Sequence, residues 1–522
     1  MELKNIKQIE TAVDDQKNEF VRLGTGFVFL FGILIYVLMH NRGIEGSLVL
    51  AAAAVIGGYM AMNIGANDVA NNVGPAVGSK AVTLMGAILI AAVFEAMGAL
   101  VAGGEVVSTI KKGIINPANI TDADTFIWLM LSALLAGALW LNLATFFGAP
   151  VSTTHSIVGG VLGAGIAAGG FGIANWDKMG AIAASWIISP VMGGVIAAGF
   201  LYFIKHNILY RQDTIQAARK FVPILLALMA WAFSTYLALK GLKKIWKLDF
   251  QTAGLVGLAV AIAVMVISKP LINRASNHLE NNREGVNSLF TVPLIFAAAL
   301  LSFAHGANDV ANAVGPLAAI ADSITNAGVS AKAAIPLWVM MIGALGIALG
   351  LMLYGPKLIK TVGSEITELD KSRAFCVAMA AAITVIIASQ LGLPVSSTHI
   401  AVGGIFGVGF LREYLKTSYA SKLHQMVEHH EGEEKQRLEA FLKDFQTASV
   451  EEMERLLRVA KAKKTELGLS KKERKRLKKV YGEKLVKRSA FKKIIAAWII
   501  TVPASAGLAA LIFTMMGGVS IS

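Results

Sequence analysis

The sequence predicts an all-α polytopic membrane protein with about 12 transmembrane helices in two inverted repeats. Hydrophobic residues make up 55% of the 522 residues and charged residues only 16%, whereas charged residues approach a quarter of a soluble protein. Apolar runs of roughly 20 residues, long enough to cross a bilayer as helices, follow one another along the chain. Two sequence motifs occur once in each half. Re-entrant or broken helices and a cytoplasmic helical loop complete the predicted fold.

The apolar runs account for most of the chain outside its charged ends and loops. The first 20 residues are charged and lack the apolar core of a secretory signal. Two runs, 151–172 and 395–411, are Gly-rich or short and begin with Pro-Val-Ser, so we expect half-helices or re-entrant hairpins there. The runs are 24–40, 47–66, 82–103, 125–147, 151–172, 178–204, 220–238, 251–269, 289–306, 330–354, 373–393, 395–411 and 494–516.

The runs and motifs divide the chain into six predicted parts. They are an N-terminal extension with one extra transmembrane helix (1–46), the first repeat (47–219), linking transmembrane helices and a loop (220–288), the second repeat (289–411), a basic loop (412–493) and a C-terminal transmembrane helix (494–522).

Segment 412–493 carries most of the excess positive charge, with 23 Lys and Arg against 13 Asp and Glu. The positive-inside rule places this loop in the cytoplasm. A basic cluster beside a membrane favours contact with anionic lipid over nucleic-acid binding. The middle of the loop has helical spacing of apolar residues and predicts a soluble helical hairpin. We interpret His424, His429 and His430 as part of a solvated polar face rather than a metal site.

The first motif, GANDVAN, occupies residues 65–71 and recurs at 306–312. A charged side chain at membrane depth costs about 2.5–3.5 kcal/mol on insertion scales, so two matched aspartates need a reason. Capping of the next helix is one interpretation. Clustered asparagines favour another, a cation site, because carboxylate and amide oxygens are hard ligands. The candidate ligands are Asn67, Asp68, Asn71, Asn308, Asp309 and Asn312.

The second motif reads PVSTTH at residues 150–155 and PVSSTH at 394–399. Proline favours the first position of a helix, and free N–H groups at a helix start bind anions. Hydroxyl groups there would add donors, although Ser and Thr in apolar helices often bond to their own backbone. The candidate anion ligands are Ser152, Thr153, Thr154, Ser396, Ser397 and Thr398. We expect His155 and His399 to be packed against backbone carbonyls.

The two copies are expected to enter the membrane in opposite directions, since an odd number of runs separates them. Inverted repeats with interrupted helices are typical of secondary transporters, whose substrate lies near the midplane.

The predicted anion and cation sites balance each other in charge. A phosphate-like anion brings about −1 to −2, two aspartates add to this, and two helix ends return about +1 in total. The motifs contain no Arg, and Lys80 is the only nearby basic side chain. Sodium ions, or protons on the carboxylates, would complete the balance. Glu95 is a further candidate for coupling or proton transfer, with no acid at the equivalent place in the second half.

Together, the duplicated GANDVAN and PVSTTH/PVSSTH motifs resemble the inorganic phosphate transporter (PiT) family over roughly residues 47–411 and the final helix. The resemblance implies a phosphate importer of the plasma (inner) membrane, driven by Na⁺ symport and alternating access, and a homodimer without a further cofactor. By motif position it assigns Na⁺ to Asp68, Asn71, Asp309 and Asn312, and phosphate to the two Ser/Thr triplets. The extension 24–40 and the loop 412–493 fall outside the family's common core.

Other functions remain open at this stage. A proton-coupled phosphate or metal-phosphate symporter, or a sulfate transporter of the same family, would carry these motifs. Ionised Asp68 or Asp309 favours phosphate, because hydrogen phosphate has an O–H to donate whereas sulfate only accepts. An anion channel would need a continuous polar pore. We do not expect an enzyme, since the apolar part shows no nucleophile-base-acid arrangement and no cluster of metal ligands. Cys376, the only cysteine, is expected to fill space.

Overall fold

The computed structural model describes residues 2–116, 120, 122–147, 151–241, 248–326, 335–365, 369–414, 440–442, 444, 456 and 488–516. In these residues the regular elements are helices, apart from one isolated bridge between Ile115 and Ala174. Eleven of the described helices are long and apolar enough to cross a membrane, close to the predicted dozen. The prediction of an all-α polytopic membrane protein is therefore confirmed. Most of the hairpin predicted in the loop 412–493 lies outside the described residues, of which 440–442, 444 and 456 are helical.

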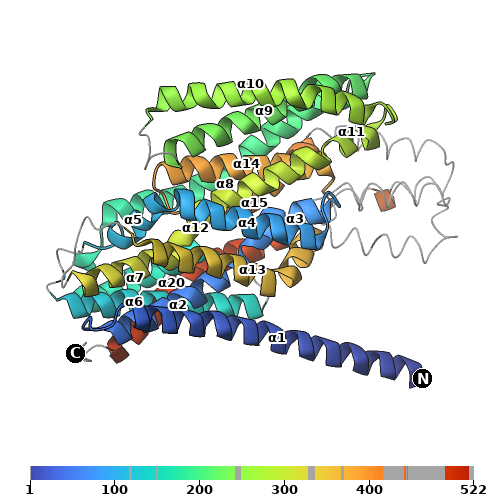
Figure 1. Cartoon of the computed structure of the whole chain (residues 1–522). Helices are drawn as coiled ribbons and strands as arrows, with labels where there is room; N and C mark the ends of the chain where they lie inside the picture. The colour runs from blue at the N-terminus through green and yellow to red at the C-terminus, as the bar shows by residue number, and fades with distance from the viewer. Residues whose placement is uncertain are drawn as a thin grey trace.

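Figure 1 shows the helices stacked side by side with their long axes roughly parallel, α10 and α1 on opposite outer sides and α12 between them. In chain order they are α1 (Glu2–His40), α2 (Ser47–Asn67), α3 (Val69–Gly78), α4 (Leu84–Ala102), α5 (Gly104–Lys112), α6 (Ala123–Phe146), α7 (Thr153–Gly169), the short η2 (Phe171–Ile173), α8 (Trp176–Ile204), η3 (Lys205–Leu209), α9 (Thr214–Lys240), α10 (Phe250–Ser276), α11 (Arg283–Leu289), α12 (Thr291–Thr325), α13 (Leu337–Glu365), α14 (Lys371–Gln390), α15 (Ser397–Tyr414) and α20 (Arg488–Met516).

Helix α12 is the core of the bundle. Every residue from Ala297 to Ser323 is buried, so no face of this helix meets lipid or water over that length. It packs against α4, α14, α5, α2 and α6, which surround it. A helix buried on all sides tolerates polar residues only where neighbouring helices satisfy them. The second GANDVAN copy lies in this stretch, so its polar side chains must find partners inside the protein.

Both GANDVAN copies lie inside long spans rather than at their ends, which corrects the predicted runs 47–66 and 289–306. The first span continues to Gly78, interrupted only at Asp68 between α2 and α3, and the second continues without a break to Thr325. The apolar run ends where the asparagines begin, but the backbone hydrogen bonds of the helix continue. The aspartates are therefore placed well inside the membrane-spanning part.

Helices α7 and α15 begin inside the protein, as the two short runs predicted. Thr153 and Thr398 in their first turns are 1% and 0% exposed. Helix α7 packs on α6, and α15 packs on α14 and α8. A helix start buried between spans is tolerated only where other groups of the protein bond its free backbone ends. The two starts are thus fixed in the middle of the bundle, where they can meet the polar residues of α12 and α2.

Helices α2 and α13 cross at very short distance because small residues meet at the crossing. A Cβ atom added to Gly65 would overlap the carbonyl oxygen of Ile347, and one added to Gly350 would overlap that of Met62. Small residues are what allow helix backbones to approach closely in membranes. This contact holds α13 against the helix that leads to Asp68.

We expect Gly350→Val to separate α2 from α13 and lower the thermal stability of the detergent-solubilised protein, since overpacking typically costs about 1–3 kcal/mol. The matched control is Gly199→Val in α8, where an added Cβ meets no atom within 4 Å. Fluorescence-detected size exclusion after heating measures both variants. Equal melting temperatures for the two would show that the α2–α13 crossing is not a tight constraint.

Candidate functional site

The carboxylate of Asp68 lies where α7 and α15 begin. The Thr153 hydroxyl donates to Asp68 Oδ2 at 2.7 Å, and the Thr398 hydroxyl donates to Oδ1 at 3.1 Å. Thr153 Oγ1 is also 3.2 Å from Asp309 Oδ2. These four residues are at most 1% exposed. Both motifs of both halves therefore meet at one buried point, although they are far apart in the sequence.

The asparagines at the end of each GANDVAN bond to the Ser/Thr triplet of the other half. Asn71 Nδ2 donates to Thr398 Oγ1 at 3.0 Å. Asn312 Nδ2 donates to Thr153 Oγ1 at 3.0 Å and to Thr154 Oγ1 at 3.2 Å. Each amide thus supports a hydroxyl that points toward the carboxylates, and the two halves are tied together through these bonds.

The earlier asparagine of each motif bonds within its own half. Asn67 Nδ2 donates to Thr145 Oγ1 at 2.9 Å, near the end of α6. Asn308 Nδ2 donates to Ser389 Oγ at 3.0 Å, near the end of α14. Thr145 and Ser389 stand at equivalent places before the two Pro-Val-Ser motifs. These bonds fix the helices that lead into α7 and α15.

The six predicted anion ligands have three kinds of surroundings. Ser152 and Ser396 are N-caps, whose hydroxyl oxygens accept the N–H of His155 and His399 at 3.1 and 3.2 Å. Ser397 Oγ is buried without a hydrogen-bond partner among the described residues.

The three threonines form the last group, and each of their hydroxyls bonds to another segment of the chain. Thr153 and Thr398 donate to Asp68, and Thr154 donates to the carbonyl of Val395 at 2.9 Å. The interpretation that the hydroxyls bond back to their own helices is therefore wrong for the threonines.

Helix capping does not explain the aspartates. Asp68 stands at the N-cap of α3 but makes no side-chain capping bond. Asp309 lies in the interior of α12, where no free backbone N–H is exposed. Their carboxylates are turned toward other elements of the structure.

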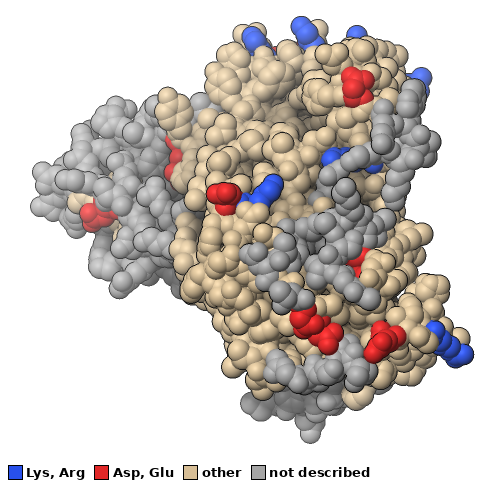
Figure 2. All heavy atoms as spheres, turned by 90° about the vertical axis from the view of Figure 1, so that its left-hand side faces the viewer, with Lys and Arg blue, Asp and Glu red and all other residues tan. Residues whose placement is uncertain are grey.

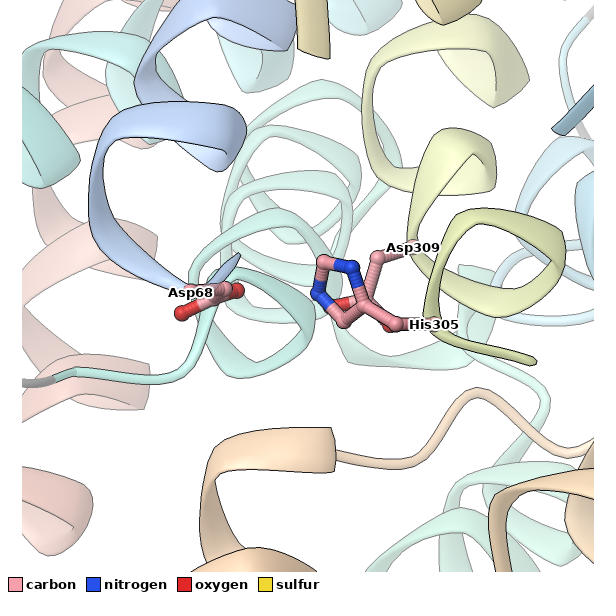
Figure 3. A group of neighbouring side chains, drawn as sticks. All are labelled: Asp68, His305 and Asp309. Carbon is pink, nitrogen blue, oxygen red and sulfur yellow. The ribbon is translucent and has the colours of Figure 1, made fainter. Parts of the chain in front are cut away.

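His305 connects Asp309 to Glu95, and the sequence did not single it out. Its Nδ1 is 2.6 Å from Glu95 Oε2, and its Nε2 is 3.1 Å from Asp309 Oδ2. The other Glu95 oxygen accepts from Asn72 Nδ2 at 2.8 Å. In Figure 3 the imidazole lies between Asp68 and the backbone of α12, on the same side as Asp309. Glu95 therefore contacts this cluster through the imidazole, and its role in coupling stays a prediction.

His305 and Glu95 contact each other, and each lacks a counterpart in the other half. The first GANDVAN is preceded by Ile64 at the place that His305 occupies in the second. The available signal was the spacing, since His305 lies four residues before Asp309 and so on the same helix face. His155 and His399 lie elsewhere, with ring centroids 4.5 Å apart. His155 is tilted against Trp186 and His399 is stacked on Trp498, so indole rings are their neighbours where backbone carbonyls were expected.

The site contains more oxygen acceptors than donors. Asn308 Oδ1, Asp309 Oδ1 and Asn312 Oδ1 are buried and accept no hydrogen bond from the described residues. Asp68, His305 and Asp309 each offer an atom within 4.8 Å of the others. The apolar part therefore does contain a cluster of possible metal ligands, contrary to the prediction. Unsatisfied buried oxygens are costly unless a cation or proton meets them.

The negative charge of the cluster is balanced only in part by the protein. The ion pairs of Glu95 and Asp309 in the described structure are with His305 alone. Lys80, the nearest basic residue in the sequence, is exposed beyond the end of α3 in a left-handed conformation with φ 59°. Three buried carboxyl groups thus share one imidazole, and added cations or protons would stabilise the arrangement.

Comparison with known proteins identifies the family. Residues 64–509 match the phosphate transporter family. The chain belongs to the phosphate transporter family. A protein of Helicobacter pylori strain J99 named "Putative phosphate permease" is 54% identical over 99% of both chains. A Pyrococcus abyssi protein given the same description is 39% identical over 70% of this chain and 89% of its own.

A solved structure of this family has the same fold. It is described as the sodium-dependent phosphate transporter, and it superposes with a TM-score of 0.73 and 30% sequence identity over 90% of this chain and 98% of its own. The family and the eleven candidate spans make this chain an integral multi-pass membrane protein. Its relatives are permeases, and the resemblance to phosphate transporters seen in the motifs is confirmed.

We expect Glu95→Gln to destabilise this phosphate transporter, because the amide offers one acceptor where the carboxylate offers two. Either the His305 ring or the Asn72 amide then faces the NH₂ group of the glutamine instead of an acceptor oxygen. The hydrogen bond that is lost, one to a charged group, is worth about 1.5–3 kcal/mol. The control is Glu45→Gln at an exposed acid between α1 and α2. Melting temperatures in detergent compare the two, and an unchanged value for Glu95→Gln would mean that this contact contributes nothing to stability.

Proposed function

We propose that this chain imports inorganic phosphate by symport with Na⁺, through alternating access between two inverted repeats. The observation that carries the proposal is the meeting of both motif pairs at Asp68 and Asp309, where hydroxyl donors and carboxylate acceptors are less than 3.5 Å apart. The family and the sodium-dependent structural relative supply the class of substrate and ion.

The starts of α7 and α15 suit a phosphate. Their first turns are buried and close to each other, and the free N–H groups and positive dipole ends there favour an anion. Thr153, Ser397 and Thr398 add hydroxyls, of which Ser397 is unpartnered in the described structure. Phosphate can also donate its O–H to a carboxylate, which sulfate cannot do.

The GANDVAN residues suit Na⁺. The carboxylates of Asp68 and Asp309 and the amide oxygen of Asn312 are hard ligands, and buried oxygens of Asp309 and Asn312 accept no hydrogen bond from the described residues. We assign the ion to these three residues and Asn71. Asn67 and Asn308 hold the neighbouring helices in place and complete the predicted cation set.

Shared donors give a physical reason for coupling. In this structure Thr153 and Thr398 donate to Asp68. A cation bound at Asp68 and Asp309 neutralises the carboxylates and leaves the hydroxyl protons free for phosphate. Phosphate in turn brings negative charge that strengthens cation binding. Each ligand thereby increases the affinity for the other, as reciprocal linkage requires.

Beyond the site, we propose how the repeats, the subunits and the basic loop are arranged. The repeats are residues 47–219 and 289–411, related by inversion, with the cross-bonds of Asn71 and Asn312 exchanged as one repeat moves against the other. The protein is a homodimer of the plasma (inner) membrane, and loop 412–493 faces the cytoplasm beside anionic lipid. The positive-inside rule supports that orientation.

Proton coupling is a second candidate, favoured by one observation. His305 places a titratable ring between two carboxyl groups, with Nδ1 2.6 Å from Glu95 Oε2 and Nε2 3.1 Å from Asp309 Oδ2. Histidine and carboxylate chains of this kind are used for proton transfer in transporters. Protons would then replace Na⁺ as the charges that accompany phosphate.

We expect labelled-phosphate uptake into proteoliposomes under an inward Na⁺ gradient, and its loss in Asp68→Asn and Asp309→Asn, since an amide cannot supply the charge that holds the cation. Folding is checked by size exclusion, with Asp177→Asn at an exposed acid in the first turn of α8 as control. Uptake driven only by a proton gradient would favour the second candidate, and competition by sulfate would mean a different anion. Full Na⁺-driven uptake by both variants would rule out the cation site.

Replacing Ser152, Thr153 and Thr154 together with Ala should raise the phosphate concentration for half-maximal uptake by at least about tenfold, because hydrogen bonds to a charged group are worth about 1.5–3 kcal/mol each. Thr384→Ala is the control, since its buried hydroxyl bonds to Ala380 of its own helix. The same half-maximal concentration in the triple variant and the control would assign these residues to packing.

A further inference from the structure

An apolar groove lies between the α9–α10 hairpin and α12. It has a volume of about 780 Å³, within the range of ligand pockets, and Phe94 of α4 closes its inner side. Helix α10 packs mainly on α9, so the hairpin stands off from the rest of the bundle along this groove. Its lining includes Met229, Val264, Leu271 and Phe296.

The groove offers nothing to a polar ligand. Two of its three serines, Ser268 and Ser288, bond to carbonyls of their own helices. The lining helices α9, α10 and α12 are candidate spans, so the groove lies at membrane depth. Ile267 and Phe296 are 61% and 57% exposed at its rim, which shows that it opens outward toward hydrocarbon. An apolar groove open to a bilayer is filled by acyl chains.

One end of the hairpin is positively charged. Arg219 of α9 donates to Ser276 at 2.6 Å and to Asn277 at 3.0 Å, which brings the start of α9 to the end of α10. Lys269 and Arg274 are exposed near this end, and neither α9 nor α10 contains an acid. The opposite end is basic as well, with Lys240 at the end of α9 and, in the sequence after it, Lys243, Lys244 and Lys247. Figure 2 views the bundle from the end of the hairpin away from α11, and Lys and Arg side chains stand along its upper edge, the side that α9 and α10 occupy in Figure 1.

Several acids near this end have partners of their own, while Glu284 at the start of α11 is exposed. Asp213 caps α9, and Glu280 accepts from Asn282 at 2.7 Å. Asp370 is paired with Arg283 and Arg373 at 2.9 and 2.8 Å. Lys269 and Arg274 form no ion pair with the described residues, so they are available to an anionic group at the membrane surface.

We propose that the groove is a binding site for an anionic phospholipid, with one acyl chain between the hairpin and α12 and the phosphate at Lys269 and Arg274. The lining residues of α10 extend from Val260 to Ala275, about 22 Å of helix at 1.5 Å per residue, enough for the chain of one leaflet, whose hydrocarbon is about 15 Å thick. Basic pockets between transmembrane helices bind anionic head groups in this way.

The occupied groove bears on the transport helix. Its wall includes Val292 to Leu300 of α12, and His305 and Asp309 follow on the same helix. A bound lipid therefore fills the space between a loosely attached hairpin and the core helix, and stabilises the packing on that side of α12.

The test is native mass spectrometry of the full chain in detergent, titrated with phosphatidylglycerol or with phosphatidylcholine of the same acyl chains. We expect one tightly held phosphatidylglycerol per chain. Ala230→Trp, which fills the groove, should remove it, with Val264→Phe as a second variant if the first is unstable. Leu255→Trp on the outer face of α10 should retain it.

Two basic residues of α10 test where the lipid head group binds. Lys269→Ala with Arg274→Ala should weaken phosphatidylglycerol binding about 25-fold and leave phosphatidylcholine unchanged, because each basic residue contributes about fivefold at an anionic head group. Lys240→Ala is the matched control. Equal retention by Ala230→Trp and Leu255→Trp, or equal affinity for the two lipids, would overturn the proposal. A third outcome would also overturn the proposal: Ala230→Trp keeps the lipid but loses the dimer. The groove would then hold a second copy of the chain.

Discussion

Three carboxyl groups buried at membrane depth, with one imidazole among them, are the constraint on which the rest of this structure depends. Asp68, Glu95 and Asp309 are at most 1% exposed. A charge in such a place costs several kcal/mol unless it is paired and hydrogen-bonded. Two buried helix starts and His305 lie next to these groups, and an asparagine from each half bonds to the threonines there. The bundle around them is arranged so that these partners can reach the carboxylates.

The same constraint joins the two halves. Asn71 of the first half supports Thr398 of the second, and Asn312 of the second supports Thr153 of the first. No apolar attraction holds helices together inside a bilayer, so polar bonds and close packing of small residues must do so. Polar bonds between halves can be exchanged for bonds to a cation or an anion, whereas the small-residue crossing of α2 and α13 cannot. The candidate site is thus also the part of the contact between halves whose bonds can be exchanged.

The repeats are similar in motif but unequal in detail. The first GANDVAN interrupts its helix at Asp68, while the second runs through α12 without a break. Glu95 occurs only in the first half and His305 only in the second, and the two are in contact. A site made from two equivalent halves thereby becomes asymmetric, because Asp309 has the imidazole of His305 beside it whereas Asp68 accepts from two threonine hydroxyls. The two positions are chemically different.

The sequence by itself determined the membrane class, the spans and the two motif pairs, because hydrophobicity and repetition are local properties that need no knowledge of contacts. It also singled out Asp68, Asp309 and Glu95, since an acid in an apolar run is costly wherever it points. Only the tertiary structure decided that Thr153 and Thr398 meet at Asp68, and that His305 joins Glu95 to Asp309. Those contacts link residues from distant helices, and their distances depend on how the helices pack. The spacing of His305 and Asp309 marks a shared helix face, but the contact of His305 with Glu95 on α4 depends on how the two helices pack.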